Sequence, residues 1–336
     1  MTAGRTNRRY NEWPTDSAPP LPDPSMPVPP TSEINDAHVL LARPPRVDVD
    51  PFRANAAFIE EEYSRHRRVE PTATLLLTNR ECPFRCVYCD LWKQTTTFRV
   101  PGGAIPRQID TALADLPAAK HIKLYNSGNF FDAQAIPPED YVAIIRRVEQ
   151  FDTVIVENHP RLCGTVVTDF ARALGTQLEV AVGLETIHPE VLPRLNKRMT
   201  LADFDAACDR LRKAGILIRV FLMLRPPFLS EDEGVDWAIR SAEYAYDRGA
   251  DCVSLIPARS GNGLMEQLQT RGLFSPPKLA SLETAFEAML APGRGRAFVD
   301  LWNAEHWSAN EPDAVERVAR LARMNLSQQV EPRIST

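Results

Sequence analysis

The feature that most restricts the fold of this chain is a series of short, nearly continuous apolar runs. Such runs are typical of strands that are covered on both faces, as in a parallel sheet, and amphipathic segments separate them here. Six runs occur in the 336 residues: TATLLLT (72–78), HIKLYN (121–126), TVIVEN (153–158), LEVAVGLE (178–185), ILIRVFLML (216–224) and DCVSLIP (251–257). Right-handed crossovers would join them into a partial barrel of six βα units or into a doubly wound sheet.

The segments between the runs carry signals of helix ends. Capping-box patterns at 200–203 and 230–233 predict two helix starts, and Gly215 and Gly249 predict the ends of the same two helices. Beyond the sixth run, RAFVDLW at 296–302 is a candidate strand, and a last helix is predicted near 311–327.

Proline content divides the chain. Residues 1–50 contain ten prolines, so we predict a largely disordered leader, interrupted by a short helix over 32–42 that Ser32 would cap. The predicted organisation is a leader (1–50), a connecting segment (51–70), an α/β core (71–262) and a C-terminal helical extension (263–336).

The charge balance argues against some partners and compartments. With 39 basic and 44 acidic residues the net charge is −5, which offers no global attraction to nucleic acid or anionic lipid. No apolar run reaches the 18 or so residues of a membrane helix, and the N-terminus lacks the apolar segment of a secretory signal. We therefore expect a cytoplasmic protein without a membrane partner.

Three cysteines within eight residues indicate a metal site. Cys82, Cys86 and Cys89 follow the first predicted strand, and the carboxyl ends of parallel strands form the ligand-binding edge of such folds. Three thiolates hold three irons of a 4Fe-4S cluster and leave the fourth open for another ligand. The alternative is a structural zinc ion, for which His66 or His121 would have to supply the fourth ligand.

The remaining cysteines are predicted to be structural, whereas three charged residues near strand ends are candidate site residues. The cysteines outside the cluster lie in apolar segments and are predicted to be core residues: Cys163, Cys208 and Cys252. Glu157 and Glu185 end apolar strands, where desolvation favours a role in a site. Arg225 precedes two prolines after the fifth strand, and we expect it at the same edge, where it could bind substrate.

The segment LTNRECPFRCVYCDLW resembles the signature of the radical S-adenosylmethionine (SAM) superfamily, with Tyr88 as the aromatic residue before the last cysteine. The strings SGNFFD, VENHPR, VGLETIHPEVLPRLNKRMT and LRPPFLSE resemble the Elongator-type branch, and within it the radical SAM subunit of archaeosine synthase. The resemblance covers about residues 70–260. It implies a partial (β/α)6 TIM-like barrel, a 4Fe-4S cluster, and SAM that is cleaved to a 5′-deoxyadenosyl radical.

The resemblance also implies cofactor-binding positions. Ser127, Gly128 and Asn129 match the turn that binds the SAM amino group, although the usual first glycine is serine here. Glu185 would lie near the methionine or ribose part of SAM. A cation, Lys197 or Arg225, would pair with the SAM carboxylate. These are cofactor-binding positions, and no catalytic residue is predicted.

The substrate is open at this stage. Relatives of the Elongator type act on tRNA, yet the chain is acidic and shows no basic aromatic stripe, so a small molecule is an equal alternative. A one-electron reductant such as a flavodoxin or ferredoxin is expected. The other class of function is a non-catalytic iron-sulfur or zinc protein that carries electrons or joins a complex. Some arginines are weak candidates for phosphate contact: Arg8, Arg9, Arg65, Arg67 and Arg68.

Overall fold

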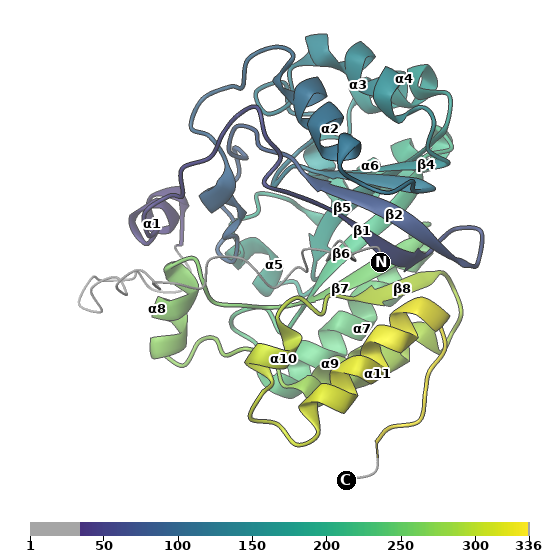
Figure 1. The fold of residues 1–336 in the computed structure, drawn as a ribbon. Helices are drawn as coiled ribbons and strands as arrows, with labels where there is room; N and C mark the ends of the chain where they lie inside the picture. The colour runs from purple at the N-terminus through teal and green to yellow at the C-terminus, as the bar shows by residue number, and fades with distance from the viewer. Residues whose placement is uncertain (1–33, 335–336) are drawn as a thin grey trace, which may run out of the picture.

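The centre of the molecule is a curled eight-stranded sheet. The structure is a computed structural model that describes residues 34–334, so the predictions for Ser32, Arg8 and Arg9 lie outside the described residues. The strands lie side by side in chain order, and all neighbours are parallel except β1 and β2, which form an antiparallel pair (Figure 1). The strands are β1 (Ala56–Tyr63), β2 (Val69–Leu76), β3 (His121–Tyr125), β4 (Thr153–Asn158), β5 (Gln177–Glu185), β6 (Leu217–Leu224), β7 (Cys252–Pro257) and β8 (Arg296–Val299).

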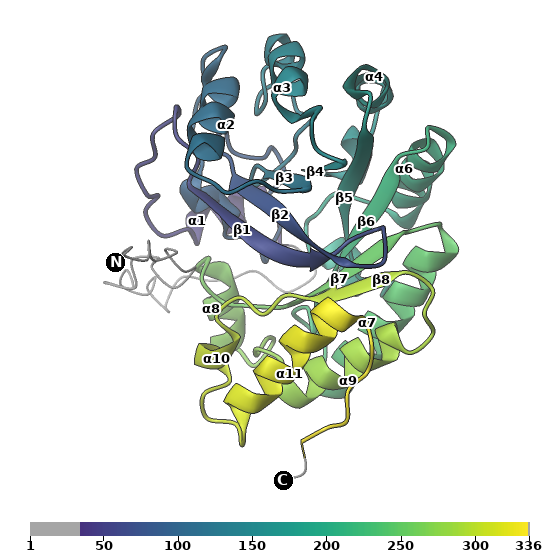
Figure 2. The ribbon, with the colours of Figure 1, turned by 45° about the vertical axis from the view of Figure 1, so that its right-hand side comes forward.

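The helices lie outside the curve of the sheet. Figures 1 and 2 show α2, α3, α4 and α6 along one side and α7, α9 and α11 along the other. The α-helices are α1 (Asp36–Leu41), α2 (Ala104–Ala114), α3 (Tyr141–Val148), α4 (Thr165–Leu174), α5 (Val191–Arg194), α6 (Leu201–Lys213), α7 (Glu231–Asp247), α8 (Leu264–Thr270), α9 (Leu279–Leu290), α10 (Ala304–Trp307) and α11 (Ala314–Ser327). Short 3-10 helices span Leu91–Gln94, Pro138–Asp140 and Pro160–Leu162.

The partial barrel predicted from the apolar runs is confirmed. Each of the six runs overlaps one of the strands β2 to β7, and the strand order follows the chain without the reversal of a doubly wound sheet. The candidate strand at 296–302 is β8, shortened to Arg296–Val299. The capping boxes that open α6 and α7 are both formed. The helix predicted over 32–42 begins at Asp36, and its cap is Asn35.

The segment 51–70, predicted as a connection, contains β1 and the turn into β2. Its sequence FIEEEY resembles a surface segment because of its three consecutive acids. Two of them form ion pairs on the concave face of the sheet: Glu60 with Lys123 at 2.8 Å, and Glu62 with Arg219 at 2.6 Å. The strand is therefore amphipathic, and its charged side chains lie on the concave face of the sheet.

Charged residues occupy this concave face because the strands alternate sides. Ile122 and Leu124 belong to the same apolar core cluster as Ile105 of α2, whereas Lys123 between them is buried among carboxylates. Arg219 donates to Glu179 at 2.7 Å and pairs with Glu62 as well. Burial of these charges is costly, so each depends on its partner for stability.

Helix α11 protects the open edge of the sheet. The amide of Asn325 exchanges two hydrogen bonds of 2.9 Å with the backbone of Val299, and the amide of Gln328 exchanges two of 2.8 Å with Ala297. These side chains take the place of a further strand, which would otherwise be able to pair with β8. Within residues 34–334, no helix has the length and apolarity needed to cross a membrane.

Candidate cluster and cofactor site

The three clustered cysteines lie in the loop that leaves the carboxyl end of β2. The N–H of Val87 in this loop donates to the carbonyl of Leu195 at 2.9 Å, and the side-chain amide of Asn262 donates to the carbonyl of Val87 at 2.7 Å. The segments that follow β5 and β7 therefore hold the cysteine loop. This is the edge at which parallel α/β folds bind ligands.

The thiols are enclosed. Burial raises the pKa of the Cys82 thiol and raises that of Cys86 to about 11, and the nearby ammonium of Lys197 acts in the opposite direction at both. The Cys82 sulfur also accepts a hydrogen bond from Nδ2 of Asn129 at 3.1 Å. A cation and an N–H donor beside the sulfurs favour the thiolate form, which is the form that binds metal.

The spacing of the sulfurs does not suit one zinc ion. Among the described His, Cys, Asp and Glu side chains, the group of three whose ligand atoms lie within 4.8 Å of one another is His66, Glu70 and His121, not the cysteines. Around a single zinc the sulfurs would be only about 3.8 Å apart, given bonds of about 2.3 Å. The two candidate fourth ligands, His66 and His121, both contact Glu70. His66 precedes β2 and His121 begins β3, whereas the cysteines follow the other end of β2. Neither histidine can therefore complete a zinc site with the cysteines.

The Ser127–Gly128 turn after β3 lies directly beside Cys82. A Cβ atom on Gly128 would be 3.3 Å from Cβ of Cys82, which is a tight contact, whereas the positive φ of 53° belongs to Ser127. Glycine is therefore needed at 128 for close approach and not for a left-handed backbone. Glu157 accepts the N–H groups of Asn126 at 2.7 Å and Gly128 at 3.2 Å, so its carboxylate holds this turn.

Glu185 and Lys197 form a buried ion pair of 2.8 Å. Lys197 also donates to the hydroxyl of Tyr88 at 3.4 Å, which connects the end of β5 to the cysteine loop. Gly183 provides the room for this pair, because a Cβ there would lie 2.3 Å from Oε1 of Glu185 and 2.5 Å from Nζ of Lys197. Burial raises the pKa of Tyr88, and the neighbouring Cys86 and Glu185 raise it further.

Arg225 is occupied elsewhere in this structure. It leaves the end of β6, but its guanidinium pairs with Glu231 at 2.5 Å and donates to the carbonyl of Pro276 at 3.0 Å. The cofactor role predicted for Arg225 would require it to leave Glu231. Arg198 is likewise paired, with Asp36 of α1 at 2.7 Å.

Several residues of the site were not singled out from the sequence. His159 donates its backbone N–H to Oδ1 of Asn129 at 2.7 Å and stacks on Phe84 with ring centres 3.8 Å apart. Asn126 is buried, and neither polar atom of its side chain has a hydrogen-bond partner in the described structure. Asn262, in the loop after β7, binds the cysteine loop through its side-chain amide. Asn126 and His159 each directly follow a strand, and this position was the sequence signal that could have identified them as site residues.

The part of the chain before β1 also packs on the cysteine loop. Glu81, next to the first cysteine, pairs with Arg43 at 2.6 Å and with Arg46 at 2.5 Å. Asn196 donates to the carbonyl of Arg85 at 2.7 Å and to Asp36 at 2.9 Å. Residues 36–46 are therefore a brace for the loop. The three core cysteines outside it are buried as predicted.

The residues present fit an iron-sulfur cluster with a polar ligand beside it. The three thiols, of which Cys86 is buried and Cys82 and Cys89 are half-buried, lie close enough for their charges to affect one another's pKa, and Lys197 supplies positive charge next to them. A cluster with three cysteine ligands leaves one iron for an amino and carboxylate ligand, for which the Ser127–Gly128 turn and the unpartnered Asn126 amide offer polar groups.

Comparison with known proteins agrees with this geometry. Residues 76–238 match the family model described as the radical SAM superfamily. An uncharacterized protein of Methanocaldococcus jannaschii is 23% identical over 250 residues, covering 69% of this chain and 68% of the relative. The archaeosine synthase subunit beta of Methanosarcina acetivorans is 32% identical over 168 residues, covering 48% of each, so the chain matches about half the length of that relative.

A solved structure shows the same fold. Methylornithine synthase (PylB) superposes with a TM-score of 0.51 and 12% identity, covering 76% of this chain and 69% of its own. The family of the matched domain binds a 4Fe-4S cluster and SAM. Residues 76–238 thus match the radical SAM superfamily, and about half of the chain is similar to archaeosine synthase subunit beta.

Proposed function

We propose that this protein uses a 4Fe-4S cluster held by Cys82, Cys86 and Cys89 to cleave SAM reductively. The resulting 5′-deoxyadenosyl radical would abstract hydrogen from a second substrate. When bound, the cluster supplies one electron to SAM, which yields methionine and a 5′-deoxyadenosyl radical. The observation that carries the proposal is the convergence of the three thiols with Asn129 and Lys197 at the carboxyl edge of the sheet.

The surrounding residues would bind and position. Asn129 donates to the Cys82 sulfur, and Glu157 fixes the turn that approaches it. Lys197, paired with Glu185, would balance the negative charge of the thiolates and of a carboxylate ligand. Tyr88 contributes a hydroxyl between this ion pair and Cys86. We keep Ser127, Gly128 and Arg225 as candidate cofactor contacts.

Anaerobic reconstitution tests this proposal. We expect about four irons per chain, a reduced EPR signal that SAM perturbs, and 5′-deoxyadenosine after addition of dithionite. Cys82→Ala should lose all three properties, whereas Cys208→Ala, which removes a buried cysteine of α6, should retain them. A protein that binds the cluster but makes no 5′-deoxyadenosine would instead support the electron-carrier alternative.

For the second substrate we propose a nucleoside of tRNA. We further propose that the reaction takes place in the cytoplasm and that a flavodoxin or ferredoxin is the reductant. The support is the similarity to archaeosine synthase subunit beta. The reconstituted enzyme should release more 5′-deoxyadenosine with total tRNA of the source organism than without it, and nucleoside mass spectrometry should detect a changed base. Stimulation that survives ribonuclease treatment, or that comes only from a small-molecule extract, would refute the tRNA proposal and leave SAM cleavage intact.

A further inference from the structure

A second cluster of metal-binding side chains lies at the opposite end of the barrel from the cysteines. His66 belongs to the turn between β1 and β2, Glu70 lies at the start of β2, and His121 begins β3. Cys82 follows the far end of β2, and the eight residues of that strand span about 20 Å or more. These three side chains therefore cannot take part in the cysteine site.

The ligand atoms of this cluster converge. Nδ1 of His66 lies 3.0 Å from Oε2 of Glu70, and Nε2 of His121 lies 3.1 Å from the same oxygen. All three ligand atoms are within 4.8 Å of one another. In a tetrahedral zinc site with bonds of about 2.0 to 2.1 Å, the ligand atoms are about 3.3 Å apart, so small rotations of these side chains would admit the ion.

The surroundings direct Glu70 toward the two imidazoles. Arg68 occupies the other carboxylate oxygen, Oε1, at 2.7 Å, which leaves Oε2 facing the histidines and the hydroxyl of Ser64. Oε2 is therefore the carboxylate oxygen that is placed to act as a ligand together with the two imidazoles.

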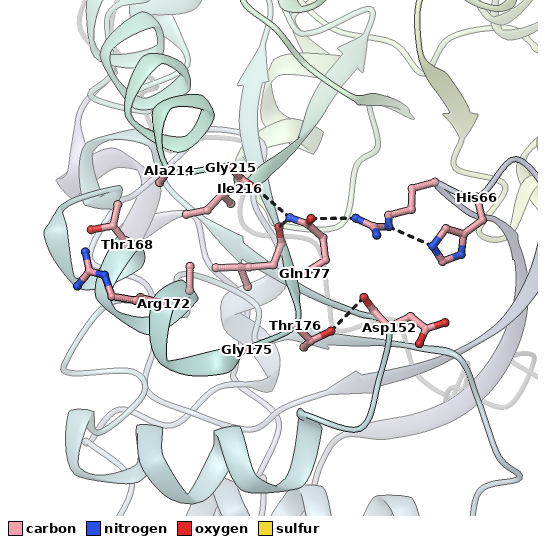
Figure 3. A pocket seen from close by; sticks show the side chains of 13 residues that line it. His66, Asp152, Thr168, Arg172, Gly175, Thr176, Gln177, Ala214, Gly215 and Ile216 are labelled. Atoms are coloured by element: carbon pink, nitrogen blue, oxygen red, sulfur yellow. Dashed lines mark hydrogen bonds between the residues drawn. The ribbon is translucent and has the colours of Figure 1, made fainter.

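The cluster has a buried side and a side near solvent. His121 is only 4% exposed, and its second nitrogen, Nδ1, would carry the imidazole proton once Nε2 binds a metal. His66 also lines an open cavity of about 720 Å³ that extends past Gln177 toward Arg172 and Ile216 (Figure 3). The Nε2 edge of His66 faces Arg65, which also lines this cavity, whereas Nδ1 faces the buried Glu70. A metal on Nδ1 would therefore lie on the inner side of the ring, where a water molecule could complete its coordination.

We propose that His66, Glu70 and His121 form a binding site for one zinc ion, with two nitrogen ligands, one oxygen ligand and a fourth position for a water molecule. Neutral imidazole and carboxylate are a donor set that zinc takes readily, and a three-ligand set leaves a position open. In the metal-free state Arg65 donates to Nε2 of His66 at 3.3 Å, so zinc binding moves the remaining proton to Nε2 and displaces Arg65.

The test separates this site from the cysteines. The full-length variant Cys82→Ser/Cys86→Ser/Cys89→Ser is titrated with Co²⁺ and then with Zn²⁺. We expect one Co²⁺ per chain, visible ligand-field bands without a sulfur-to-metal charge-transfer band, and displacement by one Zn²⁺. A stoichiometry well below one, or a charge-transfer band that shows sulfur ligation, would overturn the proposal.

Single variants in the same background assign the ligands. His66→Ala changes a partly exposed residue of a turn, so we expect it to fold and to bind Co²⁺ at least tenfold more weakly. Glu70→Gln should bind weakly as well, with folding checked by circular dichroism. The control is His306→Ala, an exposed histidine of α10, which should bind like its parent. Unchanged Co²⁺ affinity in a folded His66→Ala would refute the site.

Discussion

The side-chain amide of Asn129 donates a hydrogen bond to the sulfur of Cys82 at 3.1 Å. Donors to a cluster sulfur stabilise the more negative reduced state. We predict that Asn129→Ala lowers the reduction potential of the reconstituted cluster by on the order of tens of millivolts. EPR-monitored redox titration measures this shift.

Asn129→Asp is the informative companion. It keeps the acceptor for the N–H of His159, which lies 2.7 Å from Oδ1, but it replaces the donor with a negative charge. The potential should therefore fall further than in Asn129→Ala. Equal potentials in wild type and both variants would show that Asn129 has no electrostatic effect on the cluster.

Gly128 and Ser127 offer a matched pair of substitutions in one turn. In Gly128→Ala the new Cβ would lie 3.3 Å from Cβ of Cys82, so the cysteine must shift by a few tenths of an ångström. We expect lower iron content after reconstitution and faster cluster loss in air. Ser127→Gly should reconstitute normally, because a φ of 53° is free of strain for glycine. Iron and sulfide analysis measures the cluster content of the two variants. Equal content would contradict the argument that Gly128 is needed for close approach to Cys82.

The Lys197–Glu185 pair should dominate local stability. Lys197→Met leaves the Glu185 carboxylate buried without its 2.8 Å partner, which costs about 3–5 kcal/mol in the free energy of unfolding. Urea denaturation of the metal-free protein measures this. The double variant Lys197→Met/Glu185→Gln should recover much of the loss, because the uncompensated charge is gone.

An exposed ion pair provides the control for that measurement. Arg172 pairs with Asp169 at 3.0 Å on α4, and both side chains are more than half exposed. Arg172→Ala should cost about 0–1 kcal/mol. A loss of this small size for Lys197→Met would mean that water or another group compensates Glu185.

His159 predicts a pH dependence. Burial and the nearby charge of Lys197 lower its pKa to about 3, whereas a histidine in the unfolded chain has a pKa of about 6.5. Below pH of about 6.5 the unfolded state binds a proton that the folded state does not, so stability is full above that pH and falls as the pH falls. The loss is at most about 1.4 kcal/mol per pH unit.

Comparison with His159→Gln isolates this contribution. The glutamine amide can replace the imidazole N–H that lies 3.0 Å from the carbonyl of Lys197, but it does not titrate. Carboxylates lose their stabilising effect in acid equally in both proteins. The stability difference between wild type and variant should therefore change from about pH 7 to about pH 5, and a constant difference would show that His159 stays out of the titration.

The local pattern was sufficient for the main elements of the fold. Hydrophobic runs, the capping pairs at 200–203 and 230–233 and the cysteine spacing all depend on residues a few positions apart, and the structure contains the corresponding strands and helices. Strand β1 was not predicted, because it lies in the segment 51–70 that was interpreted as a connection. The charged partners of its acidic residues are distant in sequence: Arg219 lies 157 positions from Glu62.

The candidate site divides in the same way. The sequence alone predicted the group of three cysteines and its position after a strand, because cysteine spacing and the order of strands can be read directly along the chain. Only the tertiary structure decided that Glu157 holds the Ser127–Gly128 turn, that Arg225 pairs with Glu231, and that His66 and His121 meet at Glu70. Such contacts depend on which strand ends become neighbours and which side chains compete for each charge, and local sequence patterns do not encode that competition.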